Sequence, residues 1–474
     1  MIARYTNLRL EGLALPFVVA VPILAMLAIG LRLSLLVLPS LFAVSLSFWL
    51  VQKTTRVLDL RHLTISGFWY LCYVATIYIP SFFIYMEARE PYRSRFLFSV
   101  QATLVMVPLG FLVVNLLSKF NTREIRANYE SPIERSPSES GLSTTYVLLL
   151  AGAVGLTLLY LSEVQEIALF EILKNPVDWA YYVAVRLASF TALESRFDYV
   201  YALLRGALYP LLIVIALGYY LRLRKSFWLV VLLVSVFAGT LYAALDAAKG
   251  PVSLIFMTLG FFVYLYKAGR IKKSALALWG GLLLAFPLFV LITVGGESSR
   301  EGLQAAVETL GHRIFVTNSS VAYEYFEIFP NEVGFLHGRS IEKFAWLTGE
   351  PFFDTGEYVF EDMYSKSLEG NSAGGAFFAK FYADFGTPGV LAGGLLTGII
   401  LQGMQVFLVR RRKTILQLAT YAFLFYAAFQ INGESLPSVL LGRGVVLALV
   451  FPWVVAGISA IFASPVVQTV KDHA

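Results

Sequence analysis

The chain has 474 residues, of which 58% are apolar, 15% aromatic and 14% charged. Soluble domains carry charges at about a quarter of their positions, so this composition excludes an ordinary soluble protein and indicates a polytopic membrane protein. The net charge of +6 does not point to nucleic acid, because the basic residues gather in short loops beside apolar runs.

Apolar runs long enough to cross a bilayer recur along the chain. A span needs about 20 mainly apolar residues. Twelve runs qualify, at residues 13–30, 33–51, 65–86, 96–117, 145–162, 198–221, 227–245, 251–267, 275–294, 388–409, 415–431 and 437–462. Each is predicted to be a helix, because an open strand would leave backbone polar groups unpaired in lipid. We therefore expect an all-α polytopic membrane protein with about twelve transmembrane helices.

The ends of the runs predict an orientation. The first run follows Arg4 and Arg9 without a clear cleavage site, so it is predicted to be a retained span rather than a signal peptide. Basic residues follow the second, fourth, sixth, eighth and tenth runs, for example at Lys53, Lys119 and Arg410. With twelve spans these loops share one side, which the positive-inside rule makes cytoplasmic. Both termini are then cytoplasmic.

Three segments between the runs are polar or amphipathic. Residues 119–143 contain prolines and lack apolar periodicity, so they are predicted to be a flexible cytoplasmic linker. Residues 163–197 are amphipathic and aromatic, as in segments at a membrane surface. The long outer loop 295–387 is predicted to hold two helices, divided at Gly311 and stopped by Pro330, that form a small cap. The chain then divides into spans one to nine (1–294), this loop, and spans ten to twelve (388–474).

Two arginines lie inside predicted spans. Arg205 falls in the sixth span and Arg443 in the twelfth, each about 10 Å below the outer surface at about 1.5 Å per residue. Charges within a span are costly to insert and are candidates for function by default. Their matching depth predicts a shared cationic pocket, whereas either arginine alone equally suits snorkelling or pairing with a carboxylate.

Further charges belong to the same outer side. Asp246 and Lys249 occupy the turn DAAKGP, and Glu434 occupies the turn INGESLPS. The long loop adds four cations, namely Arg300, Arg313, Arg339 and Lys380. An arginine and lysine pocket at membrane level suits a lipid-linked phosphate or diphosphate, because guanidinium binds phosphate through paired hydrogen bonds. For any single loop arginine a solvated face is the simpler explanation.

The sequence lacks the motifs of several kinds of chemistry. A phosphate-binding loop and an Asp-x-Asp pair are both missing from the sequence. His62, His312, His337 and His473 have no ligand spacing, and Cys72 is the single cysteine. We expect no metal and no cofactor. The match GNSAG at 370–374 is attributed to chance, because a nucleophile elbow needs a strand before it.

The overall pattern resembles the Wzy-type O-antigen or oligosaccharide repeat-unit polymerases. The resemblance rests on twelve spans with both ends inside and a large, late outer loop with arginine-bearing helices. In residues it rests chiefly on 300–390, on Gly338 and Ser340 in FLHGRSIEKF, on the spacing from Arg300 to Gly311, and on the aromatic helix ending in YADFGTPG.

The resemblance implies a membrane glycosyltransferase of the GT-C class in the bacterial inner membrane, with its active site facing the periplasm. It would transfer a growing glycan from undecaprenyl diphosphate to the far-end hydroxyl of another lipid-linked repeat unit. Its partners would be undecaprenyl-diphosphate-linked oligosaccharides, the lipid bilayer and a chain-length-regulating co-polymerase, and no nucleic acid.

Site residues follow from combining this chemistry with the charges on the outer side. Arg205, Arg300, Arg313 and Arg443 are the expected diphosphate ligands, supported by Lys249, Arg339, Asn371 and Lys380. Glu434 is the leading candidate for the general base because its turn lies just before Arg443, followed by His312, Asp246 and Asp384.

Two other functions stay open. The related O-antigen ligases usually carry a His-Asn pair before the corresponding aromatic helix, and here Asn371 stands without the histidine, which favours a polymerase. A flippase or transporter of lipid-linked sugars would have a similar cationic cavity, together with a role for charges in the inner halves of its spans.

The stretch before the tenth span has a helical pattern of its own. Phe377, Phe381 and Phe385 recur every four residues, which predicts a short helix with an aromatic face. Gly386 is expected to end it, so that it hinges onto the span and lies at the outer surface as an interfacial anchor. Within the span, the glycines at four-residue spacing (389, 393, 394 and 398) predict close approach of a neighbouring helix.

Overall fold

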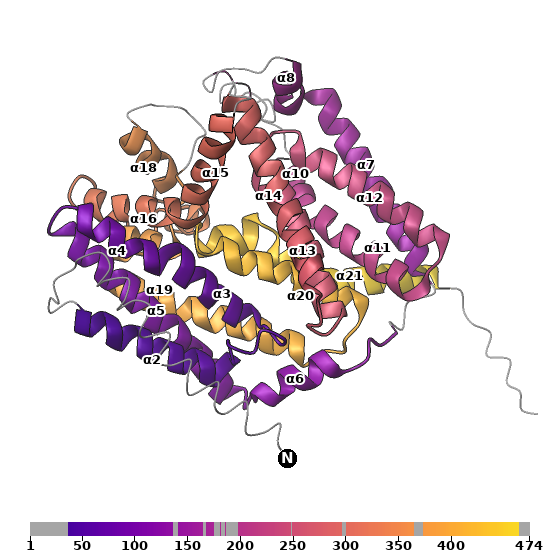
Figure 1. Cartoon of the computed structure of the whole chain (residues 1–474), viewed down its shortest axis with the longest axis horizontal. Coiled ribbons are helices and arrows are strands. Elements are labelled where there is room, and N and C mark those ends of the chain that lie inside the picture. Colours follow the sequence, from indigo (N-terminus) through magenta and orange to yellow (C-terminus); the bar gives the residue numbers. More distant parts are fainter. Residues whose placement is uncertain are drawn as a thin grey trace, which may run out of the picture. The chain divides into compact units, whose positions relative to one another are not determined.

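In the computed structural model, residues 37–135, 141–164, 167–174, 181, 185, 198–247, 249–295, 300–364 and 373–463 are described, and every regular element within them is a helix (Figure 1). Seven helices there are long and apolar enough to cross a membrane: Ile65–Glu87, Tyr92–Leu117, Leu142–Glu163, Tyr199–Leu223, Ser226–Ala244, Phe377–Val409 and Ser438–Phe462. Three shorter apolar helices accompany them, at Gly250–Tyr266, Ala277–Ile292 and Ile415–Gln430. The protein is therefore an all-helical, polytopic membrane protein.

The predicted runs correspond well with these helices. From the run 33–51 onward, each predicted run coincides with a helix, for example 96–117 with Tyr92–Leu117 and 227–245 with Ser226–Ala244. The first run, 13–30, lies outside the described residues, as do both termini.

The helices form two compact units that are not continuous in sequence. Unit 1 comprises residues 1–129, 304–410 and 427–439, and unit 2 comprises residues 130–303, 411–426 and 440–474. The helices of unit 1 are α2 (Val37–Thr55), α3 (Ile65–Tyr73), η1 (Val74–Tyr78), α4 (Ile79–Glu87), α5 (Tyr92–Leu117), α6 (Thr122–Glu130), α16 (Thr317–Ile328), α17 (Glu342–Thr348), α18 (Thr355–Tyr364) and α19 (Phe377–Val409), with most of α15 (Arg300–Phe315).

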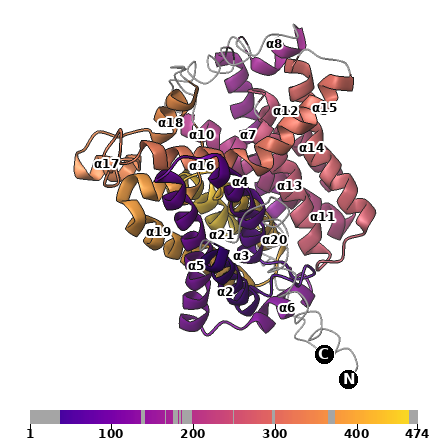
Figure 2. The same ribbon diagram turned by 60° about the vertical axis from the view of Figure 1, so that its left-hand side comes forward.

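The core of unit 1 is the packing of α19 against α5, with α2 and α3 beside them (Figures 1 and 2). A Cβ built on Gly398 would lie 2.0 Å from the carbonyl oxygen of Val107, and one on Gly110 would lie 2.5 Å from that of Leu395. Only glycine permits this separation, so the two backbones touch directly. The predicted close approach at the glycine stripe is confirmed, and α5 is the neighbouring helix.

A sharp bend divides α19. Gly386 has φ 64° and ψ −154° within an otherwise helical run. A Cβ on Gly393 would lie 2.2 Å from the ring of Phe381, whereas residues twelve apart in a straight helix are separated by about 18 Å. The segment before Gly386 therefore folds back along the span, and the predicted hinge is confirmed.

The predicted interfacial anchor is wrong for Phe377 and its neighbours. Phe377 and Phe378 are 0% exposed and Tyr382 is 3% exposed. Phe378 packs near Phe96, and Tyr382 stacks on Phe326 with ring centroids 4.1 Å apart. Phe377, Phe378 and Tyr382 are thus covered by protein, because the bend turns them into the core of unit 1, whereas Phe385 is 42% exposed.

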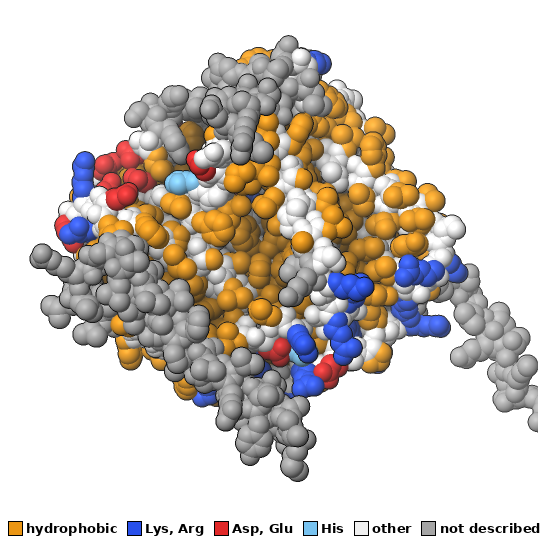
Figure 3. Space-filling view, viewed as in Figure 1, with side chains coloured by type: hydrophobic (Ala, Val, Ile, Leu, Met, Phe, Trp, Pro, Cys, Tyr) orange, Lys and Arg blue, Asp and Glu red, His pale blue; other side chains and the backbone are white. Residues whose placement is uncertain are grey.

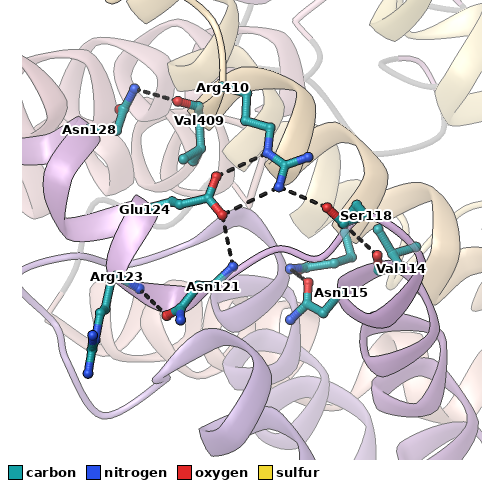
Figure 4. A network of polar contacts seen from close by, with 10 residues as sticks. Val114, Asn115, Ser118, Asn121, Arg123, Glu124, Asn128, Val409 and Arg410 are labelled. Carbon is teal, nitrogen blue, oxygen red and sulfur yellow. Dashed lines mark hydrogen bonds and ion pairs between the residues drawn. The ribbon is translucent and has the colours of Figure 1, made fainter.

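One end of unit 1 is fastened by a polar network around α6 (Figure 4). Arg410, after α19, donates from Nε to Glu124 at 3.0 Å and from Nη2 to the carbonyl of Ser118 at 2.9 Å. Asn128 donates to the carbonyl of Val409 at 3.0 Å. The Arg410 guanidinium holds the pKa of Glu124 below its usual value. The ends of α5 and α19 therefore lie together, as the alternation of spans requires.

Two expectations for the polar segments fail. The predicted flexible linker contains α6, whose Ile125 and Tyr129 are buried and whose Tyr129 hydroxyl donates to the carbonyl of Leu63 at 2.5 Å. In the long loop, the first helix continues through Gly311 to Phe315, and α16 begins at Thr317. A Cβ on Gly311 would meet nothing within 4 Å, so no close contact requires a glycine here, and the helix continues through it. The predicted stop before Pro330 is confirmed.

Unit 2 is built from the remaining helices. They are α7 (Leu142–Glu163), α8 (Ala168–Lys174), α10 (Asp198–Leu203), η2 (Leu204–Leu208), α11 (Tyr209–Leu223), α12 (Ser226–Ala244), α13 (Lys249–Tyr266), α14 (Lys273–Gly295) and α21 (Val445–Phe462), with most of α20 (Ile415–Gln430). The segment η3 (Ser438–Gly442) precedes α21. Of the predicted amphipathic segment 163–197, the structure describes α8 as its one multi-turn helix.

Helix α11 is the centre of unit 2, with consecutive residues from Tyr209 to Ala216 buried. The hydroxyl of Tyr146 on α7 donates to the carbonyl of Leu212 at 2.9 Å, which ties α7 to it. At one end of unit 2, Arg222 donates to the carbonyl of Glu134, and the Glu134 amide donates to the carbonyl of Lys413 at 2.8 Å. Loops that follow even-numbered predicted spans thus meet here as well.

Apolar side chains cover most of the described surface in Figure 3, with charged side chains confined to small groups. Phe237 on α12 is 71% exposed and Leu158 on α7 is 61% exposed. Large apolar side chains that face outward along helices of this length are what a surface in contact with lipid tails requires.

Candidate functional site

Unit 2 places Arg205 in a π-helical turn. Its segment η2 interrupts the helix that runs from Tyr199 to Leu223. π-Turns widen a helix and frequently occur at functional positions. The Arg205 Nη1 donates to Oδ2 of Asp246, which lies in the turn between α12 and α13. The side chain of Asp246 is 3% exposed and that of Arg205 is 20% exposed, so the acid is enclosed and the guanidinium reaches outward.

Tyrosines surround this ion pair. The Tyr160 ring packs against Tyr201 and Tyr242, with centroids 5.5 Å and 5.4 Å away. The Tyr242 hydroxyl donates to the carbonyl of Tyr201 at 3.4 Å, and the Tyr201 hydroxyl donates to Glu163 at 3.3 Å. The ion pair therefore lies near three phenol rings, and the hydroxyls of Tyr201 and Tyr242 are hydrogen-bonded to protein groups.

The backbone at Arg443, the second arginine inside a predicted span, lies near the backbone that follows Arg205. Arg443 follows η3 and is exposed, and Gly444 after it has φ 77°. A Cβ on Gly206 would lie 3.8 Å from the carbonyl oxygen of Arg443, and one on Gly444 would lie 2.5 Å from the Cβ of Ala207. The backbone at Arg443 therefore approaches the backbone beside Arg205, and the shared cationic pocket stays a prediction. Asp246, a third predicted site residue, pairs with Arg205.

Three predicted ligands have no described side chain. Lys249 and Arg300 begin α13 and α15, and the structure describes only their backbones. Asn371 lies outside the described residues.

Unit 1 holds Asp384 in a fold of the loop. Its Oδ1 accepts the backbone N–H groups of Gly338 at 3.0 Å and Ser340 at 3.3 Å, and its Oδ2 accepts the Ser340 hydroxyl at 2.5 Å. His337 and Gly338 adopt φ 54° and 95°, which turns the loop around the carboxylate. Asp384 therefore anchors the 336–340 segment to α19 just before its bend. Both carboxylate oxygens are engaged by this loop and Asp384 is buried, so the carboxylate is enclosed by protein.

The neighbouring cations of unit 1 have structural contacts. Arg339 donates from Nε to the carbonyl of Pro351 at 3.2 Å, which closes the loop around α17. Lys380, one turn before Asp384, is partly exposed. His312 and Arg313 are exposed near the end of α15, with His312 beside the Thr317 hydroxyl. His312 and Arg313 are thus exposed, whereas Arg339 and Lys380 are partly exposed.

Glu434 lies in the turn after α20, partly exposed, and accepts the Ser438 hydroxyl at 3.4 Å. Its turn begins with Asn432, which is 0% exposed. The side-chain oxygen and nitrogen of Asn432 have no hydrogen-bond partner within the described part of the chain, and the same holds for the hydroxyl of Tyr325 on α16. Sequence reasoning missed both residues, because neither is charged.

An acidic group on α16 and α18 was also missed. Burial, together with the nearby carboxylates of Glu327 and Asp362, raises the pKa of Glu324 to about 7. Tyr323 donates its hydroxyl to Glu327 and accepts the amide of Arg89 at 3.1 Å. The sequence YEYFE contains the signal, since acids one turn apart share a helix face. In the described residues, no group of three His, Cys, Asp or Glu side chains is arranged to hold a metal ion.

Comparisons of the chain with protein-family models, curated proteins and solved structures return no match.

Proposed function

We propose that this protein polymerises lipid-linked oligosaccharide repeat units. It transfers a growing glycan from undecaprenyl diphosphate to a hydroxyl of another lipid-linked unit, without a metal. In this proposal the chain crosses the bacterial inner membrane twelve times, keeps both termini in the cytoplasm and acts on the periplasmic face. A chain-length-regulating co-polymerase is its expected partner.

The observation that carries the proposal is the approach of Arg205 and Arg443 in unit 2. Two separate helices, each interrupted by or preceded by a π-turn, bring their arginine-bearing segments into backbone contact. Guanidinium groups bind phosphate oxygens through paired hydrogen bonds. A lipid diphosphate presents several such oxygens at membrane level, so two arginines whose backbones approach each other suit it.

The reaction assigns distinct roles to the charges. The anomeric carbon of the donor glycan forms a bond with the acceptor hydroxyl oxygen, and its bond to the diphosphate oxygen breaks. The electron pair leaves with undecaprenyl diphosphate, whose developing charge Arg205 and Arg443 stabilise. The acceptor proton passes to a base, for which we propose Glu434 because its turn comes just before Arg443 in the sequence. Asp246 is a positioning residue, since it is enclosed and paired with Arg205.

The polar ends of the helices support the orientation. In unit 1 the ends of α5 and α19 meet at α6, and in unit 2 Arg222 meets the segment around Glu134 and Lys413. These segments contain the basic loops that the positive-inside rule assigns to the cytoplasm. The turns with Asp246 and with Glu434 lie at the other ends of their helices, which the proposal assigns to the periplasm.

A transporter of lipid-linked sugars is the second candidate. The Arg205–Asp246 pair favours it, because buried ion pairs within spans also occur along the pathways of transporters. The two candidates differ in covalent chemistry, since a transporter leaves the repeat unit unchanged.

The discriminating experiment incubates purified protein with a lipid-linked repeat unit and separates the products on a gel. The proposal predicts a ladder of polymers that an Arg205→Met or Arg443→Met variant loses. Transfer of a single unit to lipid A core would instead indicate a ligase, and an unchanged repeat unit would contradict enzymatic activity.

A further inference from the structure

Two buried polar side chains have no role in the proposed reaction. One lies in the turn after α20 and the other lies in α16. Asn432 and Tyr325 are both 0% exposed. Both side-chain atoms of Asn432 and the Tyr325 hydroxyl have no hydrogen-bond partner within the described part of the chain. Buried polar groups in native proteins are nearly always paired, and each unpaired one costs free energy. Several unpaired groups in one region indicate a ligand that forms hydrogen bonds with them.

The glycine pair at 374 and 375 brings the two residues into one region. A Cβ on Gly375 would lie 2.4 Å from the Tyr325 ring, and one on Gly374 would lie 2.7 Å from the carbonyl oxygen of Gly433. Adjacent Cα atoms are only about 3.8 Å apart. The extended Gly374–Gly375 step therefore lies between the tyrosine and the turn that carries Asn432, and any side chain there would force them apart.

Asn318 completes the group. A Cβ on Gly433 would lie 3.1 Å from the Asn318 Oδ1. Asn318 and Tyr325 are seven residues apart on α16, which places them on one face of that helix. Asn318 and Glu434 are partly exposed, so the group extends from the buried Asn432 to the surface of unit 1.

The donor and acceptor types select the ligand. An asparagine amide and a phenol each donate and accept hydrogen bonds. A phosphate only accepts, so it would leave the Asn432 Oδ1 unpaired, and the Glu434 carboxylate would repel it. Sugar hydroxyls both donate and accept, and they are neutral, so they match amide, phenol and carboxylate together.

We infer that Asn432 and Tyr325, with Asn318 beside them, form a subsite that binds the hydroxyl groups of a sugar residue. The inference rests on the proposed function, because it places a sugar of the repeat unit next to Glu434, the proposed base.

The test compares Asn432→Leu and Tyr325→Phe with two matched controls. Asn115→Leu removes an amide that donates to the carbonyl of Thr54 and accepts from Gln402. Tyr70→Phe removes a hydroxyl that is bonded to Ser47. Because the two test side chains have no hydrogen-bond partner to lose among the described residues, the melting temperatures of both variants are expected to equal or exceed that of the wild type, while both controls melt lower.

Sugar binding is measured separately from catalysis. The probe is the native repeat-unit oligosaccharide freed of lipid and phosphate, and the readout is the rise in melting temperature of the purified protein. The wild type and the controls should respond, Asn432→Leu should not respond, and Tyr325→Phe should respond weakly. In the polymerisation assay, Asn432→Leu should raise KM about ten-fold, since the lost hydrogen bonds to a neutral ligand are worth that much.

Three outcomes would overturn the inference: a sugar response in Asn432→Leu equal to that of the wild type, no response in the wild type, or an Asn432→Leu protein that melts below the wild type. Failure of the proposed function gives a different result, in which the sugar response depends on Asn432 but no polymer forms. If polymer forms and the KM of polymerisation is unaffected by Asn432→Leu, the proposed polymerase function is supported and the proposed subsite is contradicted.

Discussion

Replacing Asp246 tests the role of the ion pair in unit 2. Asp246→Asn keeps the shape of the side chain but removes the charge that faces Arg205. Breaking a buried pair by removing one partner costs about 3–5 kcal/mol at full burial. Since the Arg205 side chain is 20% exposed and Asn retains a neutral acceptor, we expect a loss of about 2–3 kcal/mol in the free energy of unfolding.

A double-mutant cycle separates positioning from structure. Arg205→Met combined with Asp246→Leu leaves no charge unpaired, so the double variant should recover most of the stability that either single variant loses. It should not recover polymerisation, because the cation that binds the diphosphate is gone. Stability is measured by denaturant unfolding in detergent, and polymerisation by the gel ladder.

Two results would refute this reasoning. If Asp246→Asn changes the free energy of unfolding by less than about 0.5 kcal/mol, the pair is no more than a surface contact. If the double variant polymerises as well as the wild type, Arg205 does not bind the leaving diphosphate.

Three further predictions concern unit 1. Glu434→Gln should abolish most polymer formation at unchanged melting temperature, and a full-length polymer made at the normal rate would remove Glu434 from the role of base. Gly398→Ala should lower the free energy of unfolding by about 1–3 kcal/mol, because its Cβ would lie 2.0 Å from the Val107 carbonyl oxygen; Gly403→Ala, whose Cβ meets nothing within 4 Å, is the control and should be neutral or stabilising. The pKa of Glu324 is raised to about 7 in the fold, so its contribution to stability is present below pH 4.5 and is lost as the pH rises to 7. Glu324→Gln should therefore raise the melting temperature at pH 8 and leave it unchanged at pH 4, and an equal effect at both values would contradict the assignment.

The features that the sequence predicted correctly have local causes. Small residues at four-residue spacing predict a close helix contact, and Gly398 does contact α5. A glycine followed by Thr and Pro announces a helix stop, and Gly386 is the bend of α19. Counting residues into the two predicted spans placed Arg205 and Arg443 near each other, and their backbones do approach.

The features that it missed depend on partners distant in sequence. Nothing near Asp384 in the chain indicates that the Gly338–Ser340 loop saturates its carboxylate. The burial of Phe377 follows from the direction in which the bend turns the helix, which periodicity does not specify. For α6 a signal was present, since Ile125 and Tyr129 are one turn apart, but two apolar residues in a polar segment are too few to stand out.

The central claim is tested most directly by reconstituting the purified protein in liposomes with a lipid-linked repeat unit and following both products. A polymerase gives a ladder of lipid-linked glycans and releases undecaprenyl diphosphate, about one molecule for each bond formed, and both decline in the Arg205→Met variant. Repeat units that cross the bilayer without any covalent change, at a rate that depends on Arg205, would contradict the account and identify a transporter.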